Sequence, residues 1–144
     1  MEKIKIAVDA MGSDESPLND VSGAVIAAEL KPDVLEIILV GKEKLISEEL
    51  QKHKVKLKNI SIVNAGEVVT MEDSPTESLK TKPDSSISVG INLVKEKKAD
   101  AFISAGNTGA VMTASILKLG RIEGAGRPTI GSIFPSDVGK TMVF

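Results

Sequence analysis

Short apolar, β-branched runs alternate along this chain with segments that have the spacing of amphipathic helices. This alternation predicts an α/β fold, in which a mostly parallel sheet carries helices on both of its faces. The predicted strands are 4–8, 34–40, 59–63, 101–104, 129–134 and 140–144. The predicted helices are 18–30, 43–53, 87–98 and 108–119, with a helical turn over 75–81. We expect residues 1–144 to form a single domain of this class.

The composition argues against several classes of function. The net charge is -2 with both signs mixed, so nothing favours a nucleic-acid partner. The absence of cysteine excludes disulfides and a cysteine nucleophile, and a single histidine argues against a zinc site. No metal or cofactor is predicted. The sequence has neither a run of membrane-spanning length nor a signal-peptide pattern, so a cytoplasmic location is expected.

Segment 101–112 has the pattern of a short buried strand, a turn with two glycines and the start of a helix. The backbone N–H groups and the positive dipole end that meet in such a turn suit an anion. Gly106 and Gly109 can adopt backbone conformations closed to other residues and can let a ligand approach closely. Asn107 and Thr108 are good N-cap residues. An ordinary strand-to-helix turn remains the alternative, because glycine-rich turns are weak signals.

A second polar turn, 9–17, follows the first predicted strand. Ligands of open parallel sheets bind outside the carboxyl ends of the strands. If strands 4–8 and 101–104 are neighbours, the two turns line one crevice. Asp9 could orient a ligand there or merely cap local backbone groups, and Gly12 serves the turn in either case.

Four cations and three methionines offer weaker signals. Arg121 and Arg127 share one glycine-rich loop, where they could bind phosphate or could lie at the helix end and the surface. Lys80 and Lys82 could be a phosphate clamp or a solvated pair. Three methionines could form an apolar wall or fill the core: Met11, Met71 and Met112.

Four stretches, in this order, resemble those of one known family. They are IAVDAMGSD at 6–14 with Pro17, KTKPDSS at 80–86, SAGNTGA at 104–110, and Gly120-Arg-Ile with Arg127-Pro128. The family resembled is that of the phosphate acyltransferases called PlsX. The resemblance implies transfer of a fatty acyl group from acyl carrier protein to inorganic phosphate, giving an acyl-phosphate for phospholipid synthesis. It also implies a fold like that of the isocitrate and isopropylmalate dehydrogenases and the phosphotransacetylases, a homodimer, and peripheral association with the membrane.

The resemblance and the turn chemistry together give the candidate site. The candidate catalytic residues are Asn107, Thr108 and Asp9. The candidate substrate-binding residues are Met11, Gly12, Gly106, Gly109, Ala110, Lys80 and Arg127. The 106–109 turn would stabilise the developing oxyanion through N–H groups and the Asn107 amide. Asp9 would position a neighbouring donor or the pantetheine amides, and Arg127 would balance the charge of phosphate.

Two positions depart from the family pattern, and two other functions stay open. Ser13 stands where a glycine is favoured and Lys80 where an arginine is expected, which puts the turn geometry and a bidentate contact in doubt. The family implies a longer chain, so we expect a chain that stops within a strand at Phe144 to be truncated and inactive alone. The alternatives are a non-catalytic ligand-binding fragment and a nicotinamide-dependent dehydrogenase, although no G-x-G-x-x-G follows the first strand.

Overall fold

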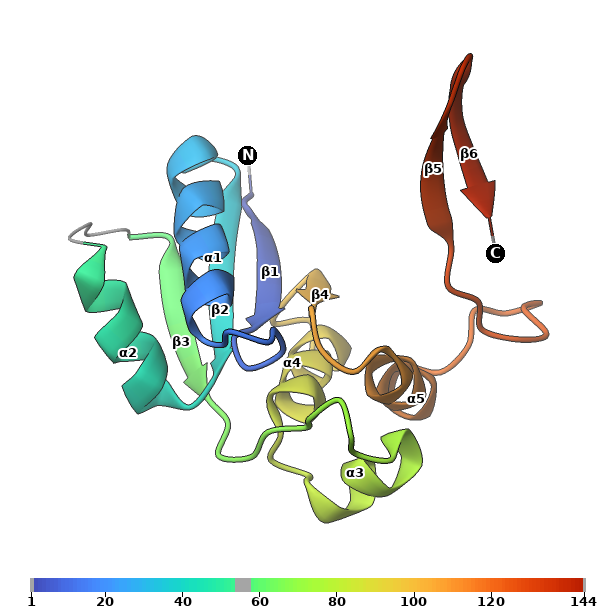
Figure 1. Ribbon diagram of the computed structural model, residues 1–144, viewed down its shortest axis with the longest axis horizontal. Coiled ribbons are helices and arrows are strands. Elements are labelled where there is room, and N and C mark those ends of the chain that lie inside the picture. Colours follow the sequence, from blue (N-terminus) through green and yellow to red (C-terminus); the bar gives the residue numbers. More distant parts are fainter. Residues whose placement is uncertain (1, 54–57, 144) are drawn as a thin grey trace.

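The structure is a computed structural model that describes residues 2–53 and 58–143. Four parallel strands form its main sheet, in the order β3-β2-β1-β4 (Figure 1). These strands are β1 (Ile4–Asp9), β2 (Leu35–Gly41), β3 (Ile60–Asn64) and β4 (Ala101–Ile103). The helices are α1 (Leu18–Leu30), α2 (Glu43–Lys52), α3 (Pro75–Thr81), α4 (Ser86–Lys95) and α5 (Thr108–Leu119). The predicted α/β class and the mostly parallel sheet are confirmed.

Helices cover both faces of the sheet. Successive side chains of β2 point to opposite faces, and both sets are buried, so each face needs a covering layer. Ile37 and Leu39 belong to a core cluster with α1 and with Ile46 of α2. Ile38 and Val40 belong to a second cluster, with side chains of α4 packed against it. The buried residues of α1 recur at three- and four-residue steps and form one inner face: Val21, Ala24, Val25 and Ala28.

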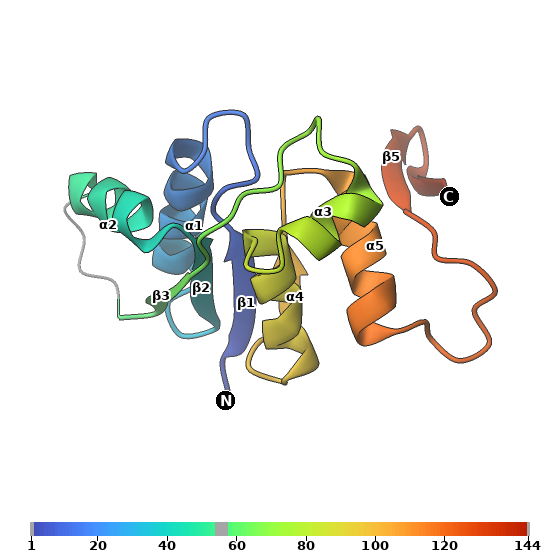
Figure 2. The same ribbon diagram turned by 90° about the horizontal axis from the view of Figure 1, so that it is seen from below.

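Helix α5 packs on α3 and α4, so it forms an outer layer beside the sheet (Figure 2). Its buried residues, Ala110 and Ala114, share a third cluster with Ile87 and Ile91 of α4. Helix α5 ends at Gly120, whose φ of 84° is the left-handed conformation that favours glycine after a helix. The predicted range 108–119 of this helix is confirmed, whereas α4 ends at Lys95 and not at the predicted Lys98.

The last two strands do not join the main sheet, which corrects the prediction. β5 (Ser132–Ser136) and β6 (Gly139–Val143) pair antiparallel with each other in a separate sheet. Both views show this hairpin apart from the main sheet (Figures 1 and 2). Only Asp137 and Val138 separate the strands, and a link of two residues makes a hairpin, whereas a parallel pair needs a long crossover. Phe144, the predicted end of the last strand, lies outside the described residues.

Candidate active site

Strands β1 and β4 are neighbours, with Val8 opposite Ile103, so the turns that follow them lie at the same end of the sheet. The turn after β1 and the segment between β3 and α3 can be followed at this end in Figure 2. Ser104 Oγ donates a hydrogen bond of 2.7 Å to Asp9 Oδ2 and thereby joins the two turns. Gly12 and Gly106 also meet, since a Cβ on Gly106 would lie 3.0 Å from the Gly12 Cα. The predicted meeting of these turns is confirmed.

Asp9 is buried, and both of its carboxylate oxygens accept hydrogen bonds from the turns. The Met11 N–H donates to Oδ1 at 3.0 Å, and the Ser104 hydroxyl donates to Oδ2. The Ser104 Oγ in turn accepts from the Gly106 N–H at 3.0 Å. Asp9 therefore caps local backbone and also orders the turn after β4. Sequence reasoning missed Ser104, and the available signal was a hydroxyl directly after a strand expected beside that of Asp9.

The glycines of the two turns are required by close packing and not by unusual backbone angles. A Cβ on Gly12 would lie 2.7 Å from Asp9 Oδ2 and 2.9 Å from the Gly106 nitrogen. A Cβ on Gly109 would lie 2.7 Å from Pro75 Cγ. None of Gly12, Gly106 and Gly109 has a positive φ, so the conformations that only glycine adopts readily are not used at these positions.

Ser13 also avoids positive φ, so a serine fits its turn without strain. Its Oγ donates to Asp20 Oδ2 at 2.8 Å, which ties the turn to the first turn of α1. Burial raises the pKa of the Asp20 carboxyl, the two hydrogen bonds from Ser13 act in the opposite direction, and the charge of Asp9 adds to the rise.

Asn107 is the N-cap of α5 and is almost completely buried. Its Oδ1 accepts from the Ala110 N–H at 3.0 Å. Its Nδ2 donates to the carbonyl oxygens of Thr70 and Asp73, each at 3.1 Å. Because both amide hydrogens are already bonded, the geometry favours a positioning role, and direct contact of this amide with an oxyanion stays a prediction.

The N–H groups of Thr108 and Gly109 are the ones that the start of α5 can offer to a ligand. The first N–H groups of a helix have no acceptor within the helix, and the dipole there favours an anion. Asn107 satisfies only the next one, that of Ala110, whose side chain is fully buried. The Ala110 N–H is therefore not available to a ligand, and Ala110 contributes only to the start of the helix.

A polar cleft of about 220 Å³ lies against Asn107. One side is the turn after β1, including Gly12 and Asp14, and the other is segment 68–72, hereafter the cleft wall. The described lining residues carry carboxylates at Asp14 and Glu72 and no basic side chain. An anion there would depend on backbone N–H groups. Sequence reasoning gave the cleft wall no role beyond the apolar wall considered for Met71. Asp73 closes a turn at its end by accepting from the Thr70 N–H at 2.7 Å.

Comparison with known proteins supports the resemblance. The sequence pattern of a family described as "Fatty acid synthesis protein" matches residues 4–144. The chain belongs to this family. A relative from Acetivibrio thermocellus named "Phosphate acyltransferase" is 48% identical over 138 residues, which are 96% of this chain and 40% of the relative. Relatives of the same name from Halothermothrix orenii and Fusobacterium nucleatum are 46% and 50% identical, over 97% and 92% of this chain and 42% and 40% of their own lengths. The chain thus spans about two fifths of the length of these relatives.

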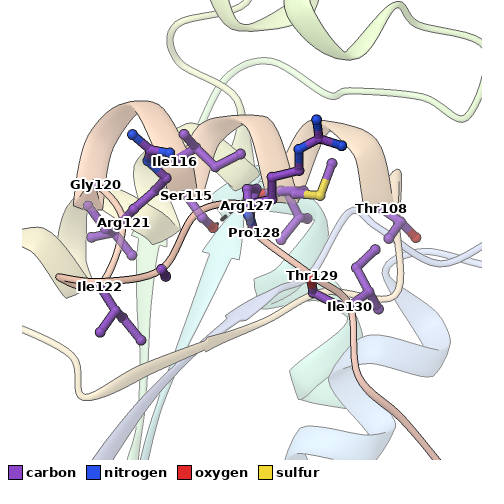
Figure 3. A pocket seen from close by; sticks show the side chains of 14 residues that line it. Thr108, Ser115, Ile116, Gly120, Arg121, Ile122, Arg127, Pro128, Thr129 and Ile130 are labelled. Atoms are coloured by element: carbon purple, nitrogen blue, oxygen red, sulfur yellow. Dashed lines mark hydrogen bonds between the residues drawn. The ribbon is translucent and has the colours of Figure 1, made fainter. Parts of the chain in front are cut away.

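Two candidate residues of this family member lie away from the cleft. Lys80 is exposed on α3, and Arg127 lines a larger groove of about 530 Å³ between α5 and the segment after it (Figure 3). Arg121 lines the same groove, and its guanidinium donates to Gly126 O at 2.6 Å, within its own loop. Lys80 and Arg127 do not line the cleft, and neither do Thr108 and Gly109. Thr108 lines the same groove as Arg127, so contact of any of these residues with phosphate stays a prediction.

The three methionines singled out in the sequence do not form one wall. Met11 contributes to the lining of the cleft, but its side chain is buried in the core cluster that includes α1. Met71 lines the same cleft from the cleft wall and is mostly exposed, whereas Met112 lines the separate groove along α5. Met11 therefore fills the core beneath the turn after β1.

Residues 2–53 and 58–143 contain no group of three or more histidines or carboxylates placed to hold a metal ion. None of the helices within these ranges is both long enough and apolar enough to cross a membrane.

Proposed function

We propose that this chain serves an enzyme that transfers a fatty acyl group from acyl carrier protein to inorganic phosphate, forming an acyl-phosphate for phospholipid synthesis. The family and the names of the relatives support this proposal. The structural observation that carries it is the Asp9–Ser104 hydrogen bond, because it joins the two turns that bear the family motifs. The joined turns lie at the start of α5, where a helix favours an anion.

The proposed reaction needs a bound phosphate whose oxygen is placed for attack on the carbonyl carbon of a bound thioester. A phosphate oxygen attacks the carbonyl carbon, a C–O bond forms, the C–S bond breaks, and the pantetheine thiol leaves. Phosphate is itself the nucleophile, so no covalent enzyme intermediate is required. The protein must orient the reactants and stabilise the oxyanion, and preorganised N–H donors suit both tasks.

The contacts suggest a division of roles among the candidate residues. The N–H groups of Thr108 and Gly109 are the proposed donors to phosphate or the oxyanion. Asp9 is a carboxylate that repels phosphate, so it acts through Ser104 and the turn after β4. Asn107 fixes the start of α5. Arg127 remains the candidate for charge balance, on the strength of the resemblance alone.

The remaining parts of the proposal also rest on the resemblance. They are acyl carrier protein as acyl donor, a homodimer, peripheral membrane association, a cytoplasmic location, and action of the 144 residues as one α/β domain. Analytical ultracentrifugation and vesicle flotation of a chain of the relatives' length would test the dimer and the membrane contact.

Product analysis tests the reaction. Palmitoyl-loaded acyl carrier protein is incubated with and without inorganic phosphate, and acyl-phosphate is trapped with hydroxylamine as the hydroxamate. The enzyme is a chain of the relatives' length that carries these 144 residues, with the 144-residue chain run in parallel. The proposal predicts hydroxamate only when enzyme and phosphate are both present. If the longer chain forms no hydroxamate in the presence of phosphate, the proposal is contradicted.

A further inference from the structure

We propose that Lys82 is a positioning residue for phosphate binding: it holds the 70–73 turn against Asn107 and thereby fixes the start of α5. This inference rests on the proposed function, because it gives Lys82 a part in binding one of the proposed substrates. Lys82 itself does not line the cleft.

Lys82 ties together the two ends of the cleft wall. It is the C-cap residue of α3, and its side chain reaches back to the segment that precedes this helix. The Nζ donates to the Val68 carbonyl oxygen at 2.9 Å and to the Asp73 carboxylate. Val68 begins the wall and Asp73 directly follows it, so the ammonium bridges the two ends of this segment. Lys82 is therefore not the solvated lysine that the sequence left open.

Asp73 connects Lys82 to α5 through hydrogen bonds. The same carboxylate oxygen that accepts from Lys82 accepts the Thr70 N–H, which closes the turn. The carbonyl oxygens of Thr70 and Asp73 then receive the two amide hydrogens of Asn107. With its Nδ2 fixed, Asn107 presents Oδ1 to the first turn of α5. A series of hydrogen bonds thus connects the ammonium to the Ala110 N–H, in the same first turn of α5 as the N–H groups of Thr108 and Gly109 that are proposed to bind phosphate.

The charge balance of the site depends on the same ion pair. The hydrogen bond from Lys82 is the main cause that lowers the pKa of the Asp73 carboxyl. Because Asp14 and Glu72 already line the cleft, an unpaired Asp73 would add a third carboxylate near a bound anion. Lys82 does not need to touch phosphate to affect its affinity.

The test is a titration of the 144-residue chain with inorganic phosphate, followed by ¹⁵N NMR. It compares the wild type with Lys82→Met, Lys82→Arg and Lys98→Met. Lys98 is the matched control, because it forms an ion pair of 2.7 Å with Glu96 beyond the end of α4. The dissociation constant is read from the backbone amides of Thr108 and Gly109. The hydrogen exchange of the Asn107 side-chain amide and the midpoint of unfolding in urea are measured on the same samples.

We expect Lys82→Met to weaken phosphate binding by about tenfold, the effect of losing one positioned hydrogen bond. The Asn107 amide hydrogens exchange faster in this variant, while the urea midpoint stays close to that of the wild type. Lys82→Arg restores both readouts because it keeps the charge and the donors, and Lys98→Met matches the wild type. Equal phosphate affinity and equal Asn107 exchange in Lys82→Met and the wild type would overturn the inference.

A double variant separates positioning from charge. Lys82→Met combined with Asp73→Asn restores the charge balance without restoring the bridge to Val68. Positioning predicts that Asn107 exchange stays fast and binding stays weak, whereas full recovery of affinity would show a purely electrostatic effect and overturn the inference. If the wild type shows no saturable phosphate shift, the proposed phosphate site fails, and with it any part of Lys82 in phosphate binding. The Asn107 exchange would then still decide whether Lys82 holds the 70–73 turn.

Discussion

At the scale of single residues, Gly12 carries the tightest constraint at the junction of the two turns. An added Cβ would meet both the Asp9 carboxylate and the Gly106 backbone nitrogen, and the backbone cannot easily move away. We expect Gly12→Ala to lower the free energy of unfolding by about 1–3 kcal/mol, as overpacking does. Gly23 is the control, because a Cβ there meets nothing within 4 Å. In the interior of α1, Gly23→Ala should stabilise by about 0.5–1 kcal/mol. Urea unfolding of both variants checks the contrast, and equal effects would contradict it.

The raised pKa of Asp20 predicts how the free energy of unfolding changes with pH. Its folded-state pKa is raised by burial, so between its ordinary pKa and the raised one the folded chain holds a proton that the unfolded chain has lost. The contribution of Asp20 to stability therefore falls as pH rises through this interval and stays reduced at neutral pH. Asp20→Asn should raise the free energy of unfolding at pH 7 by less than about 1 kcal/mol, because solvent screens a half-buried group. The gain should vanish below the ordinary pKa, and a gain that is the same at pH 3 and pH 7 would contradict this account.

Residues of the site were only partly predictable from the sequence. Asp9, Gly12, Asn107 and Gly109 stand out because short polar and small residues directly after strands are unusual for a core. The partners of Asn107 were not predictable, since Thr70 and Asp73 are distant in sequence and meet it only through their carbonyl oxygens. Every residue has a backbone carbonyl oxygen, so the identities of residues 70 and 73 do not indicate that they accept these hydrogen bonds. The cleft wall therefore could not be assigned to the site.

At the scale of elements, the caps of α4 and α3 offer a matched pair. Ser85 is fully buried and its hydroxyl accepts from the Ser88 N–H, whereas the N-cap Ser74 of α3 makes no such bond. We expect Ser85→Ala to lower the free energy of unfolding by about 1 kcal/mol. Ser74→Ala should change it by only a few tenths of this amount. Thermal unfolding followed by circular dichroism measures both, and a larger loss in Ser74→Ala would refute the role of the Ser85 cap.

The elements that the sequence predicts best are those with a strong local pattern. α1 follows from its apolar spacing and β2 from a continuous apolar run, and both were found within a residue of the predicted ends. The hairpin was misassigned because β5 continues through Pro135 to Ser136, two residues beyond the predicted end at 134. With β5 extended through this proline, the remaining link is too short for a parallel connection.

At the scale of the whole molecule, the main sheet and its helices should fold without the hairpin. Every residue from Arg121 to Val143 is exposed, so little buried apolar surface is lost when this segment is removed. A chain ending at Gly120 should unfold cooperatively, with a midpoint within about 5 °C of that of the 144-residue chain. A chain ending at Ser104 is the contrast, because it also loses the buried Ala110 and Ala114 of α5. Loss of cooperativity in the Gly120 variant would show that the hairpin segment stabilises the sheet.

The central claim is that the two joined turns bind the phosphate that accepts the acyl group. The most direct test measures release of free acyl carrier protein from its palmitoyl thioester over a range of phosphate concentrations. It uses a chain of the relatives' length that carries these 144 residues, as wild type, Gly12→Ala and Gly23→Ala. We predict saturable, phosphate-dependent release by the wild type and Gly23→Ala, and a loss of at least about tenfold in kcat/KM for phosphate in Gly12→Ala. Release that does not depend on phosphate, or equal activity of the two glycine variants, would contradict the claim.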